Sequence, residues 1–364
     1  MSQALIGRGA VSDSIDPARC QLFISVIVPV RNEEKFLGPL LDRLLGQRYD
    51  PACFEVIVVD GESNDGTVQV VENRRVYYAN LHLLRNSRVL ASAGRNIGVR
   101  AARGDVVVIV DGHCEIETCD YLSELAETFI RSGADCIGRP QPLDVSKATN
   151  LQRAIALARP SWLGHQPASF IYANRECFAP PESIAVAYQR TVFDAVGLFD
   201  EEFDACEDVE FNHRVDRAGL RCYFAPRLAV RYAPRNSLSG LFRQMARYGR
   251  GRVRLLRKDP TTFSAPCFLP AVFLLVLILG AITAWMTPWL SWAYSALLGI
   301  YVLTTAAVSC GLALRARDVR VLAWLPFVFA AIHLGAGWGV LQEGLRGKKI
   351  VLASSSRPQP ADRL

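Results

Sequence analysis

The spacing of apolar residues changes along the chain. Up to about residue 265, apolar residues occur in short runs rich in Val and Ile, which alternate with amphipathic stretches. Runs of this kind predict strands, and the amphipathic stretches predict helices. From Phe268 onward come three long apolar blocks, 268–286, 292–314 and 319–341. A helix needs about 20 apolar residues to cross a bilayer, so the pattern predicts an α/β unit followed by a membrane part. Buried helices of a large globular core are the alternative.

Four short runs follow one another in a strand and helix order. We expect strands at 23–30, 54–59, 82–84 and 106–110, with helices after the first three. This order makes right-handed crossovers and a parallel sheet. The last run is apolar throughout, which indicates a strand buried on both faces.

Polar residues follow these strands at their carboxyl ends, which meet at one edge of the sheet, where such sheets bind ligands. Asp60 can accept hydrogen bonds from a base or a ribose. Asp111 and His113 offer a carboxylate and an imidazole to a metal ion that carries an anionic ligand. An Asp-Gly turn with a solvated histidine explains the two residues equally well. The chain has no Gly-x-Gly-x-x-Gly after the first strand and no Gly-Lys-Ser/Thr loop, which argues against hydride transfer and ATP hydrolysis.

An acidic cluster lies at the start of a predicted helix, between residues 204 and 210. Acids in a first helical turn are favoured by the helix dipole, so a structural role is one interpretation. The adjacent Glu207 and Asp208 also repel each other, and one of them facing a cleft would have its pKa raised toward that of a working base. Asp208 is therefore the candidate base, with Glu207 beside it.

A basic run precedes the first apolar block. Residues 241–258 contain seven cations and no acid. Nucleic acid can bind such a run, but the neighbouring apolar blocks make anionic lipid headgroups and a lipid-linked diphosphate the better partners. A solvated basic helix is the structural alternative. The net charge of +6 comes largely from this run and the membrane-flanking arginines, and we expect no nucleic-acid partner.

Charge and cysteine usage bear on location. The amino terminus has no basic-then-apolar signal, so we expect residues 1–265 to stay in the cytosol. None of the ten cysteines forms a Cys-x-x-Cys pair, and Cys114 and Cys119 lack the second pair that a zinc site needs.

Cations at 315–320 and at 346–349 both indicate a cytoplasmic side, which three membrane spans cannot provide for both groups. One block is then re-entrant, or the tail crosses regardless.

Six motifs resemble, in order and spacing, those of the family 2 glycosyltransferases of GT-A fold. The Asp-x-His form and the basic run are similar to the succinoglycan (exopolysaccharide) glucosyltransferase branch, and the likeness covers residues 22–260. The motifs are Val26–Glu34, Val58–Thr67, Gly94–Gly98, Asp111–His113, Glu207–Asp208 and Gln244–Tyr248.

The resemblance implies a Rossmann-like, mostly parallel α/β catalytic domain followed by transmembrane helices. It implies inverting transfer of a hexose, glucose in this branch, from a UDP-sugar to a hydroxyl of a lipid-linked (polyprenyl diphosphate) saccharide. The residues it assigns are Pro29 and Glu33 in the nucleotide pocket, Asp60 on the uracil or ribose, Arg95 near the donor, Asp111 and His113 at the metal and diphosphate, Asp208 as base with Glu207, and Gln244, Arg247 and Tyr248 as a gate for acceptor and diphosphate.

Two departures from the family pattern matter. Tyr248 stands where the family's signature has Trp, and with only three membrane blocks this argues for single addition rather than processive polymerisation. His113 replaces the usual second aspartate, which removes a negative charge and adds a nitrogen ligand, so we expect Mn²⁺ rather than Mg²⁺.

Two other functions stay open: a polyprenyl-phosphate sugar synthase, and a membrane-bound nucleotide-sugar sensor without turnover. The loop between residues 161 and 190 is expected to touch the acceptor, and we expect His333, more than His165, to be a packed structural residue. The protein is predicted to lie in the bacterial inner membrane with its catalytic domain in the cytoplasm. The predicted units are a lead-in (1–21), a catalytic domain (22–240), a basic interfacial segment (241–265), a membrane domain of about three helices (266–345) and a polar tail (346–364).

Overall fold

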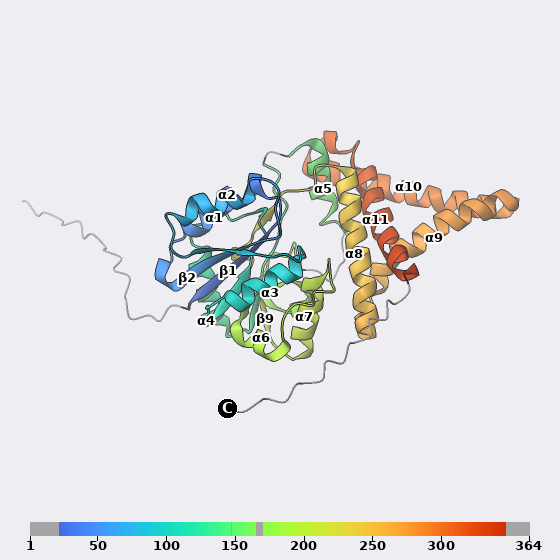
Figure 1. The fold of residues 1–364 in the computed structure, drawn as a ribbon. Coiled ribbons are helices and arrows are strands. Elements are labelled where there is room, and N and C mark those ends of the chain that lie inside the picture. Colours follow the sequence, from blue (N-terminus) through green and yellow to red (C-terminus); the bar gives the residue numbers. More distant parts are fainter. Residues whose placement is uncertain (1–21, 147, 165–169, 347–364) are drawn as a thin grey trace, which may run out of the picture.

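The computed structural model describes residues 22–146, 148–164 and 170–346, so His165, the predicted lead-in and most of the predicted tail lie outside the described residues. Figure 1 shows a twisted sheet with helices on both faces, and a second group of helices beyond the long helix α8. The elements are β1 (Ile24–Val30), α1 (Glu34–Leu45), β2 (Phe54–Asp60), α2 (Thr67–Arg75), β3 (Leu81–Arg85), α3 (Ala91–Ala101), β4 (Val106–Ile109), β5 (Cys114–Glu115), α4 (Tyr121–Ser132), β6 (Cys136–Gly138), α5 (Asn150–Ala158), β7 (Cys177–Ala179), β8 (Ala185–Gln189), α6 (Arg190–Val196), α7 (Glu207–Arg217), β9 (Cys222–Phe224), β10 (Arg231–Tyr232), α8 (Leu238–Lys258), α9 (Ala265–Met286), α10 (Pro288–Ala316) and α11 (Leu325–Leu345).

The first half of the sheet confirms the predicted parallel arrangement. Its strands lie in the order β3-β2-β1-β4, and Ile24 of β1 is in register with Phe54 on one side and Val106 on the other. Val26 and its neighbours on one face pack against α1, α2 and α4, whereas Ile27 and the opposite face pack against α3, α6 and α7. Both faces are covered, which is why these strands are apolar throughout.

The second half of the sheet adds β8, β6, β9 and β7 beyond β4, with β8 antiparallel to both β4 and β6. The sheet is therefore mostly parallel, as expected, whereas the antiparallel pairing of β8, and of β7 with β9, was not predicted from the sequence. A separate two-stranded ribbon pairs β10 with β5 and places Tyr232 opposite Cys114. This ribbon fixes the backbone directly after Asp111 and His113.

Helices α8 and α11 lie side by side and run in the same direction (Figure 1). Added Cβ atoms at Gly249 and Gly339 would lie 2.3 Å from the Ala336 carbonyl oxygen and 2.0 Å from the Ala246 carbonyl oxygen. Only glycine permits backbones to approach this closely. The basic helix is thus held along its length against an apolar partner.

Helices α9 and α10 project away from the rest of the molecule as a pair (Figure 1). By length and composition, three helices could cross a membrane, over Ala265–Ala284, Trp289–Ala316 and Leu325–Leu345. They differ in burial: 6% and 17% of the most apolar windows in the first two are buried inside the protein, against 44% in the third.

Candidate active site

A cavity of about 620 Å³ opens above the carboxyl ends of β1 and β4. The start of α7 forms a second wall, and α8 forms a third. The motifs that are far apart in sequence meet here, since the lining includes Pro29, Glu33, Arg95, Asp111, His113, Glu207, Asp208, Gln244, Arg247 and Tyr248. All the predicted site residues except Asp60 therefore share one hollow.

Arg95 joins the two acidic parts of the cavity. It extends from α3 with its side chain 11% exposed, and its Nη1 lies 3.0 Å from Glu207 Oε1 while its Nη2 lies 3.6 Å from Asp111 Oδ1. Its guanidinium also stacks on the ring of Phe199, 5.5 Å from the centroid. One buried cation thus fixes the spacing between the end of β4 and the start of α7.

The two carboxylates on Arg95 respond differently to burial. Burial alone would raise the pKa of Asp111, but Arg95 and His113 hold it below its ordinary value, and the Tyr232 hydroxyl donates a hydrogen bond of 2.9 Å to Oδ2. Burial raises the pKa of Glu207 above its ordinary value, despite Arg95. The rise predicted for one of the adjacent acids therefore falls on Glu207, while Asp208 is exposed to the cavity.

His113 is oriented by a carboxylate. Its Nδ1 lies 3.1 Å from Glu33 Oε1, and its ring meets Tyr232 edge-on at 5.4 Å between centroids. This leaves Nε2 without a protein partner among the described residues, the arrangement that orients a histidine toward a metal. No group of three or more His, Cys, Asp or Glu side chains within the described ranges is placed to hold a metal. Asp111 and His113 fit a divalent ion only if phosphate oxygens and water complete its coordination.

Asp60 does not line the cavity. It ends β2 in a buried position, where Oδ2 accepts a hydrogen bond from the Ser63 amide at 3.1 Å and the buried Oδ1 has no partner among the described residues. Its neighbour Val59 lines the wall instead. The contact of Asp60 with a base or ribose therefore stays a prediction.

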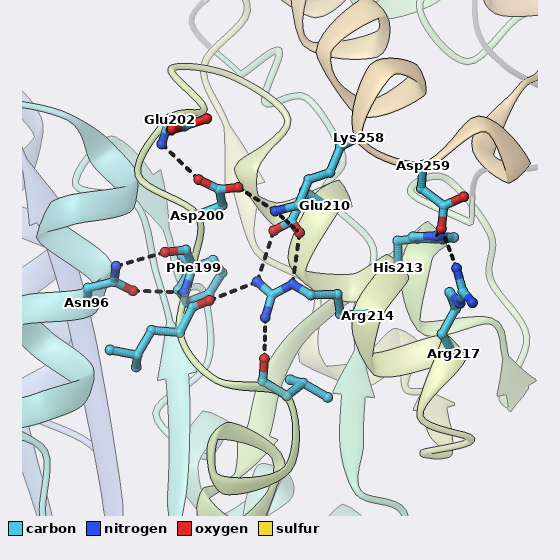
Figure 2. Close-up of polar contacts among 12 residues, drawn as sticks. Asn96, Phe199, Asp200, Glu202, Glu210, His213, Arg214, Arg217, Lys258 and Asp259 are labelled. Carbon is cyan, nitrogen blue, oxygen red and sulfur yellow. Dashed lines mark hydrogen bonds and ion pairs between the residues drawn. The ribbon is translucent and has the colours of Figure 1, made fainter. Parts of the chain in front are cut away.

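The start of α7 is held by a polar network (Figure 2). Arg214 pairs with Glu210 at 2.8 Å and donates to the Leu198 carbonyl at 2.7 Å, and Lys258 at the end of α8 pairs with Glu210 at 2.9 Å. Asn96, the residue after Arg95 on α3, exchanges two hydrogen bonds of 2.9 Å with the backbone of Phe199. Helices α3, α7 and α8 are thereby tied into one unit around the acids.

The residue before Glu207 has an unusual backbone. Cys206 adopts a left-handed conformation with φ 62°, which is strained for a residue with a side chain. An added Cβ at Gly251 of α8 would lie 2.6 Å from Cys206 Sγ. Close packing of α8 on this turn keeps the adjacent acids directed at the cavity.

Comparison with known proteins agrees with this geometry. The model of glycosyl transferase family group 2 matches residues 118–314, more than half of the chain, and that of glycosyl transferase family 2 matches residues 25–178. The chain belongs to the family 2 glycosyltransferases.

Curated relatives of this glycosyltransferase include a dolichyl N-acetyl-alpha-D-glucosaminyl phosphate 3-beta-D-2,3-diacetamido-2,3-dideoxy-beta-D-glucuronosyltransferase of Methanococcus voltae, 25% identical over 89% of the chain and 98% of the relative. The succinoglycan biosynthesis protein ExoA of Rhizobium meliloti is 28% identical over 63% of the chain and 68% of that protein. A mannosyltransferase of Pyrobaculum calidifontis, solved with GDP-Man and Mn²⁺, shares the fold with a TM-score of 0.55 and 20% identity over 88% and 87% of the two chains.

Sequence analysis of this glycosyltransferase missed several cavity residues: Arg139, Arg159, Tyr172 and Tyr232. None of them lies in a recognisable motif. Tyr172 does fall in the loop that was expected to touch the acceptor. His333 is packed as expected, because its Nε2 lies 2.9 Å from the Leu163 carbonyl and its Nδ1 lies 3.0 Å from the Tyr301 hydroxyl.

Proposed function

We propose that this glycosyltransferase transfers a hexose, glucose by the branch resemblance, from a UDP-sugar to a hydroxyl group of a lipid-linked saccharide, with inversion. The observation that carries the proposal is Arg95, which holds Asp111 and Glu207 within reach of one guanidinium. A nucleotide diphosphate at the strand ends would then face the acid on α7 across a single cavity. The M. voltae relative is named for a glycosyl transfer onto a lipid-linked sugar, which supports this class of acceptor.

In this proposal Asp208 acts as the base. It takes the proton of the acceptor hydroxyl while that oxygen bonds to the anomeric carbon, and the bond to the diphosphate breaks with its electron pair leaving on the diphosphate. A single displacement inverts the anomeric centre. Arg95 holds Glu207 beside the base, while Gln244, Arg247 and Tyr248 form the wall through which the acceptor enters.

Asp111 and His113 would hold a divalent ion together with the donor diphosphate. When bound, such an ion neutralises charge on the leaving diphosphate. We expect a chelator to abolish sugar transfer, and Mn²⁺ to restore it better than Mg²⁺ because of the imidazole ligand. Transfer by the purified protein, measured after dialysis against each ion, checks this. Equal recovery with both ions would contradict the role given to His113.

The donor and acceptor are tested directly with purified full-length protein. We expect a radiolabelled sugar to pass from a UDP-sugar to a lipid-linked saccharide and not to bare polyprenyl phosphate. Transfer to bare polyprenyl phosphate would favour the synthase function. UDP binding without UDP release in the presence of membrane extract would favour the sensor.

For the membrane part we propose two spans, α9 and α10, with α11 lying along the membrane surface. Near its start, α11 packs on α5 through Phe329 and Ile332, and near its end Glu343 pairs with Arg254 at 3.1 Å. Arg254 in turn pairs with Asp204 at the cavity rim. A helix whose two ends both lie against the catalytic domain runs along that domain, whereas α9 and α10 project from it (Figure 1).

Two spans also resolve the conflict in charge. The cations at 315–320 and at 346–349 then fall on the same side as the catalytic domain, as the positive-inside rule requires. The cations of α8 are largely used within the protein, since Arg247, Arg250, Arg254, Arg257 and Lys258 all contact other parts of the chain. Fewer cations of α8 are therefore free to bind lipid headgroups than its sequence predicts.

Reporter fusions test this topology in intact bacterial cells. We expect green fluorescent protein fused after Leu364 to fluoresce, and alkaline phosphatase fused after Thr287, between α9 and α10, to be active. Alkaline phosphatase fused after Leu364 should be inactive. Activity at that position would show three spans instead.

A further inference from the structure

Arg159, directly after α5, is a half-buried cation in the wall of the cavity that no motif assigns. We propose that Arg159, with Tyr172 and Tyr248, forms a subsite for the phosphate of the lipid-linked acceptor. That the phosphate belongs to an acceptor rests on the proposed function. The presence of an anion subsite rests on the geometry alone.

The neighbours of Arg159 in space include two tyrosines and a methionine. Tyr172 and Tyr248 line the cavity together with it, its Nη1 lies 3.5 Å from Met245 Sδ, and its Cζ lies 5.9 Å from the centre of the Tyr248 ring. Its Nε is buried and has no hydrogen-bond partner among the described residues. We call Arg159, Tyr172 and Tyr248 together the cage. The Tyr248 side chain is 42% exposed, so the cage is open to the cavity.

What Arg159 lacks is a counterion. Arg95, in the same cavity, pairs with Glu207, but no carboxylate in the described part of the chain lies within ion-pair distance of Arg159. Residues 165–169 are His, Gln, Pro, Ala and Ser, which adds no acid to the sequence nearby. A half-buried charge whose Nε is buried without a hydrogen-bond partner among the described residues, and which has no opposite charge nearby there, is costly, and this indicates that an anionic ligand completes the site.

The chemistry of the cage suits a phosphate. The guanidinium presents its donors in a planar fork that matches phosphate oxygens, and charge-assisted hydrogen bonds of this kind are the strong ones. Two tyrosine hydroxyls beside it can turn to donate to the same oxygens.

The position of the cage identifies the source of the phosphate. Arg159 lies where α5 meets α8, and Ile155 and Leu241 line the cavity there and join an apolar cluster that reaches Phe329 of α11. This wall adjoins α11, the helix that we place along the membrane surface. The metal-binding candidate Asp111 contacts a different set of groups, Arg95 and Tyr232. A lipid phosphate entering from the bilayer therefore meets Arg159, while the donor diphosphate meets Asp111.

Binding of farnesyl diphosphate tests the proposal without turnover. Full-length protein in nanodiscs of neutral lipid is titrated with farnesyl diphosphate, farnesol, inorganic pyrophosphate and UDP. We expect Arg159→Gln to weaken farnesyl diphosphate about 10- to 100-fold and leave UDP unchanged. Arg153→Gln is the matched control, because Arg153 lies on the same helix, pairs with Asp318 and does not line the cavity. We expect it to bind like the wild type.

Each other result overturns part of the proposal. Unchanged farnesyl diphosphate binding in Arg159→Gln rules out the subsite, and an equal loss of UDP binding assigns Arg159 to the donor. Pyrophosphate that binds as tightly as farnesyl diphosphate rules out the lipid. If Arg159→Gln does not fold, Arg159→Lys and Tyr172→Phe take its place in the titration. Each is expected to weaken farnesyl diphosphate binding, and an unchanged affinity for UDP shows that the variant is folded. Sugar transfer that fails in a protein with the subsite intact counts against the proposed function and not against the subsite.

Discussion

Asp208→Asn is expected to lower the rate of sugar transfer by about 10²- to 10⁴-fold, the usual contribution of a positioned base. Asp208 is exposed to the cavity at the first turn of α7, directly after the strained turn at Cys206. Asparagine has nearly the same shape but cannot take the acceptor proton. Donor binding should therefore survive, so kcat falls while the Kd for UDP changes little. Both are measured on the full-length protein.

The matched control is Asp216→Asn, the same change on the exposed outer part of α7. It should leave the transfer rate unchanged. Near-normal turnover in Asp208→Asn with intact UDP binding would show that Asp208 is not the base. Glu207 would then be the next residue to test.

Arg95→Met is expected to abolish detectable transfer and to destabilise the fold by about 3–5 kcal/mol, because it leaves two carboxylates in the cavity wall without their cation. Glu207 loses an ion pair of 3.0 Å at a site where its side chain is 10% exposed, and Asp111 loses its contact with Nη2. Chemical denaturation gives the loss of stability, and the transfer assay gives the loss of rate.

A double variant separates the two effects. Adding Glu207→Gln to Arg95→Met removes the more buried of the two unpaired charges and leaves Asp111, so stability should recover in part while transfer stays absent. Arg100→Met, on the exposed face of the same helix, is the control and should change neither quantity. Full activity in the double variant would show that Arg95 serves the fold alone.

The architecture links the apolar C-terminal helices to the candidate site. Helix α8 packs on α11 on one side, and on the other its Gly251 packs on Cys206 and its Lys258 pairs with Glu210 (Figure 2). The acids of α7 are thus positioned by a helix that also carries Gln244, Arg247 and Tyr248. The candidate catalytic side chains and the proposed membrane-surface helix α11 are parts of one packed unit.

The sequence by itself determined the elements and the chemistry at their ends. Apolar runs such as Val106–Val110 specify strands buried on both faces, because local periodicity depends on side chains that are close in sequence. For the same reason, residues in local motifs, among them Asp111, His113 and the Glu207–Asp208 pair, could be identified before any coordinates. The long apolar blocks also predicted the three helices that are long and apolar enough to cross a membrane.

Tertiary structure decided which of these residues act together. Contacts between residues that are distant in sequence leave no local pattern. Examples are the ion pairs of Arg95 with both acids, the hydrogen bond from Tyr232 to Asp111 and the contact of Arg159 with the Tyr248 ring. Packing placed Asp60 behind the cavity wall and laid α11 along α8 instead of leaving it exposed like α9. Hydropathy reports only how apolar a segment is, whereas whether it faces lipid or protein depends on what the rest of the chain packs against it.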